Sequence, residues 1–323
     1  MTAGGEAVSA ETISVVVPVH DEERSVALLL DELRSALEPL DRPWEAIFVD
    51  DGSTDGTFSA LTRLHARNEE VRVVRLRRNF GKAVALMAGF EQAGGGIVVT
   101  IDGDLQDDPA EIPRLLAKLD DGFDLVSGWK TRRRDPWLRR ILSRMFNFTA
   151  GRMSGLRLHD MNCGLKAYRG EVVRELRLYG ELHRFIPVLA HHRGYRIAEL
   201  PVNHRPRSHG RSRYGPERYL RGFLDLFSVS FLGRYGHRPL HLFGGLGLLL
   251  GLGGVGVLVY LTILKAGGEA IGKRPLLILG VLLVVVGIQL FSLGLLSEMI
   301  ISHHEERPRD RERGRSQVEE ILQ

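Results

Sequence analysis

Short β-rich apolar runs and longer stretches of helical periodicity alternate along the first part of the chain. Apolar runs of this length predict strands, and apolar residues spaced three or four apart predict helices. The expected strands are 13–19, 46–49, 71–76, 97–101 and 125–127. The expected helices are 22–37, 57–66, 82–92 and one capped by Asp108 with Pro109 in its first position. This order indicates an α/β fold with a mostly parallel sheet covered on both faces.

Beyond residue 238 the pattern changes to two long apolar stretches. Residues 239–264 contain no Asp, Glu, Lys or Arg, and residues 275–301 contain only Glu298. About 20 apolar residues in a helix cross the core of a bilayer, so we expect two membrane-spanning helices. Two buried helices of a soluble core are the alternative, but such helices rarely lack a polar face. Glycines three or four apart, at 244, 247, 251 and 254, would allow close helix packing in lipid.

Basic residues predict the orientation of these spans. Four arginines lie at 218–238 and five at 307–315, whereas the intervening loop holds Lys265, Lys273 and Arg274. Both ends are therefore expected on the cytosolic side. The N-terminus lacks the pattern of a cleavable signal peptide. The single Cys163 excludes an intrachain disulfide and a cysteine-cluster zinc site.

The expected organisation has six parts. Residues 1–12 are disordered, 13–217 form a cytosolic α/β domain, and 218–238 form an amphipathic juxtamembrane helix. The spans are 239–264 and 275–301, and 302–323 are a charged cytosolic tail that is disordered or loosely helical.

Acidic residues follow two of the expected strands. Asp50 and Asp51 precede Gly52-Ser53, and the fourth strand runs into Asp102-Gly103-Asp104 and Gln106. Ligands of parallel sheets bind at these carboxyl ends. Carboxylate and amide oxygens suit Mg²⁺ or Mn²⁺, and Gly103 leaves room for a diphosphate. Each motif alone fits an ordinary turn, but together they favour metal-assisted binding of a phosphate-containing ligand.

Six segments together make the chain resemble the family 2 inverting glycosyltransferases of the GT-A fold. The resemblance is to the polyprenyl-phosphate (dolichyl or undecaprenyl) type with a C-terminal membrane hairpin. The segments are VVPVHDEERS, FVDDGSTDGT, RRNFGKAVALMAGF, TIDGDLQDDP, NCGLKAYRG and RSHGRSRYG. Over about residues 13 to 300, the resemblance implies a Rossmann-like nucleotide-sugar-binding domain. The family usually has Asn where this chain has Asp21.

The resemblance also implies roles for individual residues. Donor binding is implied for Pro18, Glu22, Asp50, Asp51, Lys82, Asp102 and Gly103. The ligands implied for Mg²⁺ or Mn²⁺ are Asp102, Asp104 and Gln106. Asp104 and Asp160 are the catalytic candidates, Asp160 at the position usually proposed as the base. An acceptor phosphate is already anionic at neutral pH, so Asp160 could instead orient the acceptor or hold its loop.

Two basic stretches, 130–144 and 205–221, indicate an acceptor-phosphate site. The resemblance singles out Lys130, Arg144, Ser212, Arg213 and Tyr214. A basic face against anionic lipid is the alternative, and nucleic acid is disfavoured because no binding module accompanies the arginines. The resemblance also implies that residues 181–190 form a short interfacial helix along the membrane surface.

The sequence thus predicts a metal-dependent hexosyltransferase that loads polyprenyl phosphate at the cytosolic membrane face for cell-envelope glycosylation. UDP-glucose is slightly favoured as donor, with GDP-mannose and others open. A processive polysaccharide synthase is disfavoured because no Gln-x-x-Arg-Trp occurs and two spans make a poor conduit. A catalytically inactive nucleotide-binding membrane module is disfavoured by the acids at 102 and 104. Related enzymes can form tetramers, so a homo-oligomer is a further expectation.

Overall fold

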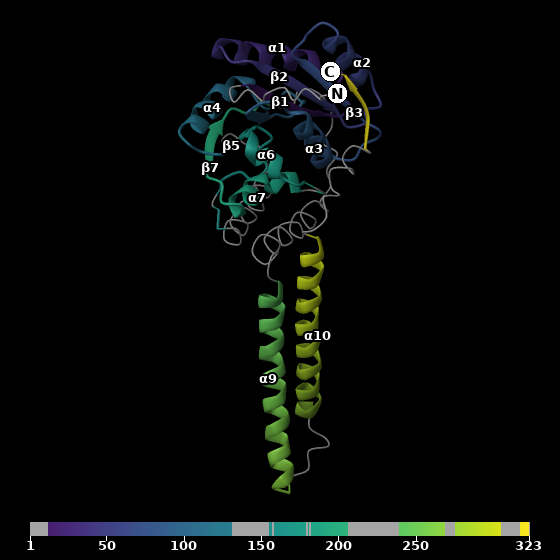
Figure 1. Ribbon diagram of the computed structural model, residues 1–323, viewed down its shortest axis with the longest axis vertical. Helices are drawn as coiled ribbons and strands as arrows, with labels where there is room; N and C mark the ends of the chain where they lie inside the picture. Colours follow the sequence, from purple (N-terminus) through teal and green to yellow (C-terminus); the bar gives the residue numbers. More distant parts are fainter. Residues whose placement is uncertain are drawn as a thin grey trace, which may run out of the picture. The chain divides into compact units, whose positions relative to one another are not determined.

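The computed structural model describes residues 12–130, 155–156, 158–178, 180, 182–205, 239–268, 275–304 and 317–322, with side chains up to residue 300 in the last helix. The chain divides into two compact units (Figure 1). One unit contains the α/β domain together with the C-terminal strand. The other contains the two long apolar helices.

A mixed eight-stranded sheet forms the centre of the α/β domain. Its strands are β1 (Ile13–Val19), β2 (Trp44–Asp50), β3 (Val71–Leu76), β4 (Ile97–Thr100), β5 (Leu125–Lys130), β6 (Lys166–Arg169), β7 (Ile197–Val202) and β8 (Val318–Leu322). They lie in the order β7-β5-β6-β4-β1-β2-β3-β8. Strand β1 pairs in parallel with β2 and β4, β2 with β3, and β5 with β7. Strands β6 and β8 run antiparallel to their neighbours.

Helices cover both faces of this sheet (Figure 1). They are α1 (Val26–Leu37), η1 (Glu38–Leu40), α2 (Thr57–His65), α3 (Lys82–Gln92), η2 (Pro109–Glu111), α4 (Ile112–Asp120), α6 (Gly170–Glu175), η3 (Leu182–Phe185) and α7 (Ile186–His192). Val15 and Val17 of β1 share one core with α1, α2 and α4. Val16, between them, belongs to the other core with α3, α6 and α7. Alternation along the strand therefore supplies both cores.

The predicted α/β fold is confirmed, including the five expected strands and the four expected helices. Asp108 does cap its helix, since its carboxylate accepts a hydrogen bond from the Ala110 N–H at 3.2 Å. That helix starts as the 3₁₀ turn η2 before α4 begins. Residues 182–192 are helical as expected, but Phe185, Ile186 and Val188 are buried in the core of the domain. Most apolar side chains of this segment therefore pack in the protein core and are not available to a membrane surface.

The expectation for the C-terminal tail is wrong at its end. Strand β8 pairs antiparallel with β3, with Val73 opposite Leu322, and Glu319 lies 3.7 Å from Arg75. Val318 packs against the core on one face of the sheet and Leu322 against the core on the other face. Charged residues lie between the two, so the sequence shows no clear strand pattern there. The strand also covers the backbone edge that β3 would otherwise expose. The expected parts 1–11, 218–238 and 305–316 lie outside the described residues.

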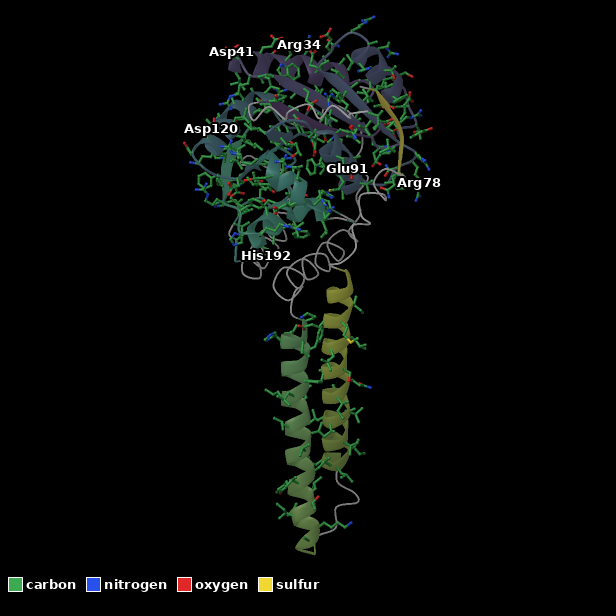
Figure 2. All side chains as sticks on the ribbon, viewed as in Figure 1. Arg34, Asp41, Arg78, Glu91, Asp120 and His192 are labelled. Carbon is green, nitrogen blue, oxygen red and sulfur yellow. The ribbon has the colours of Figure 1, made fainter. Side chains whose placement is uncertain are left out.

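The second unit consists of α9 (Pro239–Ala266) and α10 (Pro275–His304). Both are long and apolar enough to cross a membrane, and their side chains are almost entirely carbon (Figure 2). The helices approach closely at glycines. A Cβ on Gly247 would lie 2.6 Å from the Gly287 carbonyl oxygen, and one on Gly254 would lie 2.7 Å from that of Gly280. Small residues thus set the helix spacing, as the sequence predicted.

Glu298, the lone acid of α10, has a structural partner at the start of α9. Its Oε2 accepts a hydrogen bond from the Leu240 N–H at 3.2 Å. The first N–H groups of a helix have no acceptor within the helix, and leaving one unpaired in an apolar environment is costly. Glu298 of α10 therefore caps the N-terminus of α9.

Substitution of Gly247 by Leu should separate α9 from α10. The new side chain would occupy space held by the α10 backbone, and overpacking of this kind costs about 1–3 kcal/mol. Gly253→Leu is the matched control, because no atom lies within 4 Å of its added Cβ. We expect the temperature at which the detergent-solubilised protein aggregates to fall for Gly247→Leu alone. Equal behaviour of the two variants would contradict this packing.

Candidate active site

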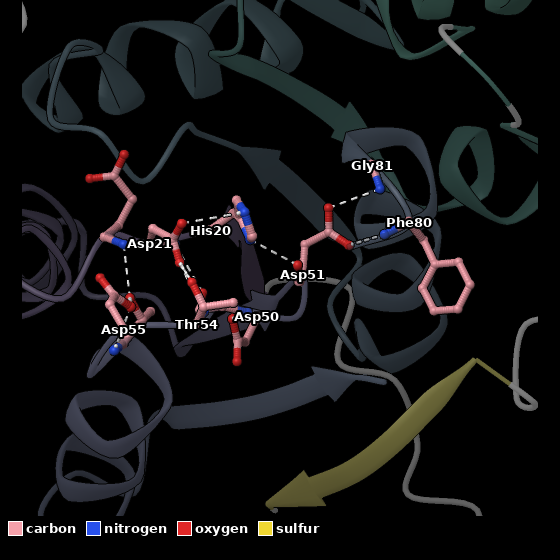
Figure 3. A network of polar contacts seen from close by, with 11 residues as sticks. His20, Asp21, Asp50, Asp51, Thr54, Asp55, Phe80 and Gly81 are labelled. Carbon is pink, nitrogen blue, oxygen red and sulfur yellow. Dashed lines mark hydrogen bonds and ion pairs between the residues drawn. The ribbon is translucent and has the colours of Figure 1, made fainter. Parts of the chain in front are cut away.

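The loops that follow β1 and β2 are tied together by short polar side chains (Figure 3). The Asp21 N–H donates to Ser53 Oγ at 3.0 Å, and Asp21 Oδ1 accepts from the Thr54 N–H at 2.9 Å. Glu22 is fixed similarly, since its N–H donates to Thr57 Oγ1 at 2.8 Å. Asp21 has a φ of 56°, in the left-handed region that Asn and Asp tolerate better than most residues. The shared tolerance explains why Asp can replace the family's usual Asn here.

Asp51 anchors the loop that leads into α3 (Figure 3). Its carboxylate accepts hydrogen bonds from the Phe80 N–H at 2.7 Å and the Gly81 N–H at 2.9 Å. Burial raises the pKa of Asp51, although these two donors act in the opposite direction. Because α3 begins at Lys82, Asp51 sets the position of that lysine. These contacts show that Asp51 positions the loop before α3. Its predicted contact with the nucleotide-sugar donor stays a prediction.

Asp50 lies fully buried at the end of β2. Its Oδ1 accepts a hydrogen bond from the Ser53 N–H at 3.0 Å, and its Oδ2 lies 3.9 Å from Arg75 Nε. Arg75 also stacks over the Phe58 ring and approaches Glu319 of β8. Strand β8 is therefore linked through one arginine to the predicted nucleoside residue Asp50.

The segment after β4 places Asp102 beside two other elements. Lys82 Nζ of α3 contacts Asp102 Oδ1, and the side chain of Asp102 is 32% exposed. A Cβ on Gly164 would lie 2.6 Å from the Asp102 carboxylate, so a larger residue there would displace that carboxylate. Gly103 likewise packs against Val19 of β1. Asp104 Oδ1 accepts a hydrogen bond from the Gln106 N–H at 3.2 Å, which orders the turn.

These residues have the ligand chemistry of a nucleotide-bound Mg²⁺ or Mn²⁺. Within the described ranges no cluster of three or more His, Cys, Asp or Glu could hold a metal by itself. Mg²⁺ at nucleotide sites typically takes one or two carboxylates, with substrate phosphates and water completing its shell. Asp102, Asp104 and Gln106 fit that arrangement. The ammonium of Lys82 compensates the charge of Asp102.

A buried charge cluster that the sequence did not reveal lies next to this turn. Asp107 is fully buried, with Lys130 Nζ 3.1 Å and His204 Nδ1 3.3 Å from its Oδ1. Burial by itself would raise the pKa of Asp107, but His204 and Lys130 hold it well below its usual range. Burial would likewise lower the pKa of Lys130, and attraction to Asp107 raises it instead. Lys130, predicted to bind acceptor phosphate, thus already has an internal counterion.

Asp160 is buried in a loop that Glu199 of β7 holds in place. Glu199 accepts hydrogen bonds from the Asp160 N–H at 2.7 Å, the His159 N–H at 2.8 Å and His159 Nδ1 at 2.9 Å. Asp160 Oδ1 accepts from the Asn162 N–H at 3.1 Å. The His159 ring stacks on Trp129 with centroids 4.1 Å apart. Loop-holding contacts of Asp160 are therefore present, and its roles as base or orienting group stay predictions.

Several predicted acceptor residues lie outside the described ranges. They are Arg144, Ser212, Arg213 and Tyr214. The predicted donor and metal residues lie at the carboxyl ends of the parallel strands. They are Pro18 and Asp50 in the last residues of β1 and β2, Glu22, Asp51 and the 102–106 turn in the loops after the strands, and Lys82 at the start of α3. The structure thus brings these residues to the edge of the sheet that those strand ends form.

The chain is similar to known proteins in sequence and in fold. The sequence profile of "Glycosyl transferase family 2" matches residues 14–177. Dodecaprenyl-phosphate galacturonate synthase from Rhizobium johnstonii is 43% identical over 294 residues, covering 89% of this chain and 87% of that protein.

Solved structures of glucosyl-3-phosphoglycerate synthase from Mycobacterium tuberculosis share the fold. The complex with Mn²⁺, uridine diphosphate and phosphoglyceric acid has a TM-score of 0.54 at 21% identity and covers 72% of this chain and 84% of that one. The complex with phosphoglyceric acid has a TM-score of 0.52 at 23% identity and covers 72% and 85%.

Replacement of Lys130 by Met should destabilise the α/β domain. The change leaves the Asp107 carboxylate buried beside only His204, and breaking a buried ion pair costs about 3–5 kcal/mol. We expect a large loss in urea unfolding of the full-length protein, and partial recovery in the double variant Lys130→Met/Asp107→Asn. Unchanged stability in Lys130→Met would show that Asp107 does not depend on this lysine.

The pH dependence of stability follows from the same cluster. The folded pKa of Asp107 lies below the unfolded value of about 3.9. Its stabilising contribution is therefore complete above pH ~4 and is lost as pH falls towards the folded pKa. Asp107→Asn should flatten the acid limb of the unfolding free energy below pH ~4. An acid limb as steep as that of the wild type would contradict the depressed pKa.

Proposed function

Since this chain belongs to glycosyl transferase family 2, we propose that it transfers a sugar from a nucleotide-sugar donor to a polyprenyl phosphate at a membrane. The 43% identity to a dodecaprenyl-phosphate galacturonate synthase carries this proposal. An alignment that covers 89% of the chain has to include part of the two apolar helices as well as the α/β domain. The similarity therefore extends beyond the donor-binding fold to the membrane unit.

The proposed donor is a nucleotide-activated hexuronate. The sequence slightly favoured UDP-glucose, whereas the relative's name specifies galacturonate, so a sugar acid becomes the better-supported choice. UDP stays the proposed nucleotide. At the edge of the sheet, Asp102, Asp104 and Gln106 would hold Mg²⁺ or Mn²⁺ against the donor diphosphate. When bound, the cation neutralises the diphosphate and stabilises the charge on the departing nucleotide.

The proposed transfer is a single displacement. A phosphate oxygen of the acceptor attacks the anomeric carbon while the bond from that carbon to the nucleotide diphosphate oxygen breaks on the opposite face. The configuration inverts, and the nucleoside diphosphate leaves with the electron pair of the broken bond. Acceptor phosphate is mostly anionic at neutral pH, so the step requires no strong base. In this proposal Asp160, held by Glu199, orients the acceptor side.

The lipid phosphate is proposed to bind the basic groups Arg144 and Arg213, with Ser212 and Tyr214 beside them. Arginine suits this task because its planar fork donates two parallel hydrogen bonds to phosphate. Lys130 is the weakest member of the predicted set, since Asp107 already neutralises it. Holding two anionic reactants in line is the main contribution expected from these cations.

We also propose that α9 and α10 cross the membrane as a hairpin, with the α/β domain and the tail on the cytosolic side. Strand β8 follows α10 in the chain and pairs with β3 of the α/β domain. This pairing supports placing the end of α10 on the same side of the membrane as that domain. Two crossings give this placement, and the arginines at both ends favour the cytosol. A homo-oligomer remains a prediction.

The decisive experiment supplies the purified full-length protein with polyprenyl phosphate, Mg²⁺ or Mn²⁺ and a panel of nucleotide sugars. Mass spectrometry of the lipid should show a polyprenyl-phosphate hexuronate formed from UDP-galacturonate or UDP-glucuronate. Asp104→Asn should lose at least 100-fold in rate because it weakens the cation site, whereas the exposed control Asp121→Asn should not. No sugar-bearing lipid from any donor would refute the proposed function.

Cysteine labelling tests the topology. In a Cys163→Ser background, Glu269→Cys between the spans should react with a membrane-impermeant maleimide added to intact cells. Gln317→Cys, next to β8, should react only after the membrane is permeabilised. Labelling of both positions in intact cells, or of neither, would contradict the hairpin.

A further inference from the structure

A small polar pocket lies beside the predicted cation site. Its polar lining includes Lys82, Thr100, Asn162, Lys166 and His183. Leu86 and Ile186 supply part of its apolar wall. Two lysines and a histidine thus converge on a space that no step of the proposed transfer yet uses.

Lys166 is the unusual member of this lining. It begins β6, opposite Thr100 of β4, and is 3% exposed. Its Nζ donates to the Cys163 carbonyl, and no carboxylate of the described residues lies within ion-pair distance. Burial lowers the pKa of Lys166, although the negative charges of Asp160 and Asp102, which lie beyond ion-pair distance, act in the opposite direction. A buried ammonium without a counterion is costly, whereas methionine would fill similar space without that cost.

The position of the pocket relates it to the donor. Lys82, one of its lining residues, contacts the Asp102 carboxylate, and Gly164, another, packs directly against that carboxylate. A diphosphate held at Asp102 and Asp104 would therefore place the attached sugar next to this pocket. The sugar is the part of the donor that differs between a hexuronate and a neutral hexose.

We propose that this pocket binds the carboxylate of an anionic donor sugar, and that Lys166 is the residue that distinguishes a hexuronate from a neutral hexose. The inference rests on the proposed function for the identity of the donor class. The sugar carboxylate would supply the counterion that the described residues do not give Lys166. Asn162 and His183 add polar groups that can meet its second oxygen.

The test compares UDP-galacturonate with UDP-galactose, which differ at C6, on wild type and Lys166→Met. Calorimetric titration of each nucleotide sugar into the full-length protein in detergent with Mn²⁺ measures binding without any acceptor. We expect wild type to bind UDP-galacturonate more tightly than UDP-galactose. Lys166→Met should weaken UDP-galacturonate binding by roughly 10- to 100-fold, as for lost hydrogen bonds to charged groups, and change UDP-galactose binding less than about threefold.

Two controls keep the outcome readable. Lys118→Met removes a lysine from the outer face of α4 and should leave both affinities unchanged. Lys166→Gln, with UDP binding as the measure of an intact donor site, replaces Lys166→Met if that variant misfolds. An equal loss for both sugars, or no loss for either, would overturn the carboxylate assignment. So would a wild type without preference for the uronate. Selective uronate binding without transfer to lipid would instead overturn the proposed function alone.

Discussion

Parallel pairing of β1 with β2 and β4 brings the carboxyl ends of three strands to one edge of the sheet. Each of these ends continues into acidic residues, so negative charge accumulates where a nucleotide diphosphate is proposed to bind. Much of the surrounding structure compensates this charge in different ways. Asp51 accepts hydrogen bonds from backbone amides. Asp102 forms an ion pair with Lys82, and Asp107 forms ion pairs with Lys130 and His204. Of these three cationic partners, Lys82 has the most exposed side chain, at 31% against 15% for Lys130 and 20% for His204, so a divalent cation could displace it most readily.

The kind of group that compensates each carboxylate indicates what that carboxylate does. Amide donors and buried ion partners are fixed by the fold, which suits residues that position loops. An ammonium at the end of a flexible side chain can move away when a cation approaches. Lys82 also lines the pocket in which Lys166 lies, so both lysines face the region where the donor would bind. A negative edge and a positive pocket side by side match a ligand that carries both a metal-bound diphosphate and a sugar acid.

The sequence predicted those parts of the site that depend on local order along the chain. The positions of Asp102 and Asp104 just after a buried strand, and of Lys82 at the start of a helix, were predicted because residues nearby in the chain determine them. Their roles stay predictions. The Asp107 cluster was missed because its partners Lys130 and His204 come from distant segments, and the aspartate sits within an acidic run that already had an explanation. Glu199 was missed for the same reason, since it meets the Asp160 loop only through the pairing of β7 with β5. Strand β8 was not predicted because charged residues separate its few apolar residues.

The pairing of β8 with β3 also determines when the domain can be completed. Strand β3 precedes both apolar helices along the chain, and β8 follows them. The outer edge of β3 therefore stays unpaired until both helices and β8 have been synthesised. If the helices cross the membrane as proposed, insertion of only one of them would leave β8 on the opposite side from β3, and the two strands could not pair. In that topology the sheet is completed only in molecules in which both helices have crossed.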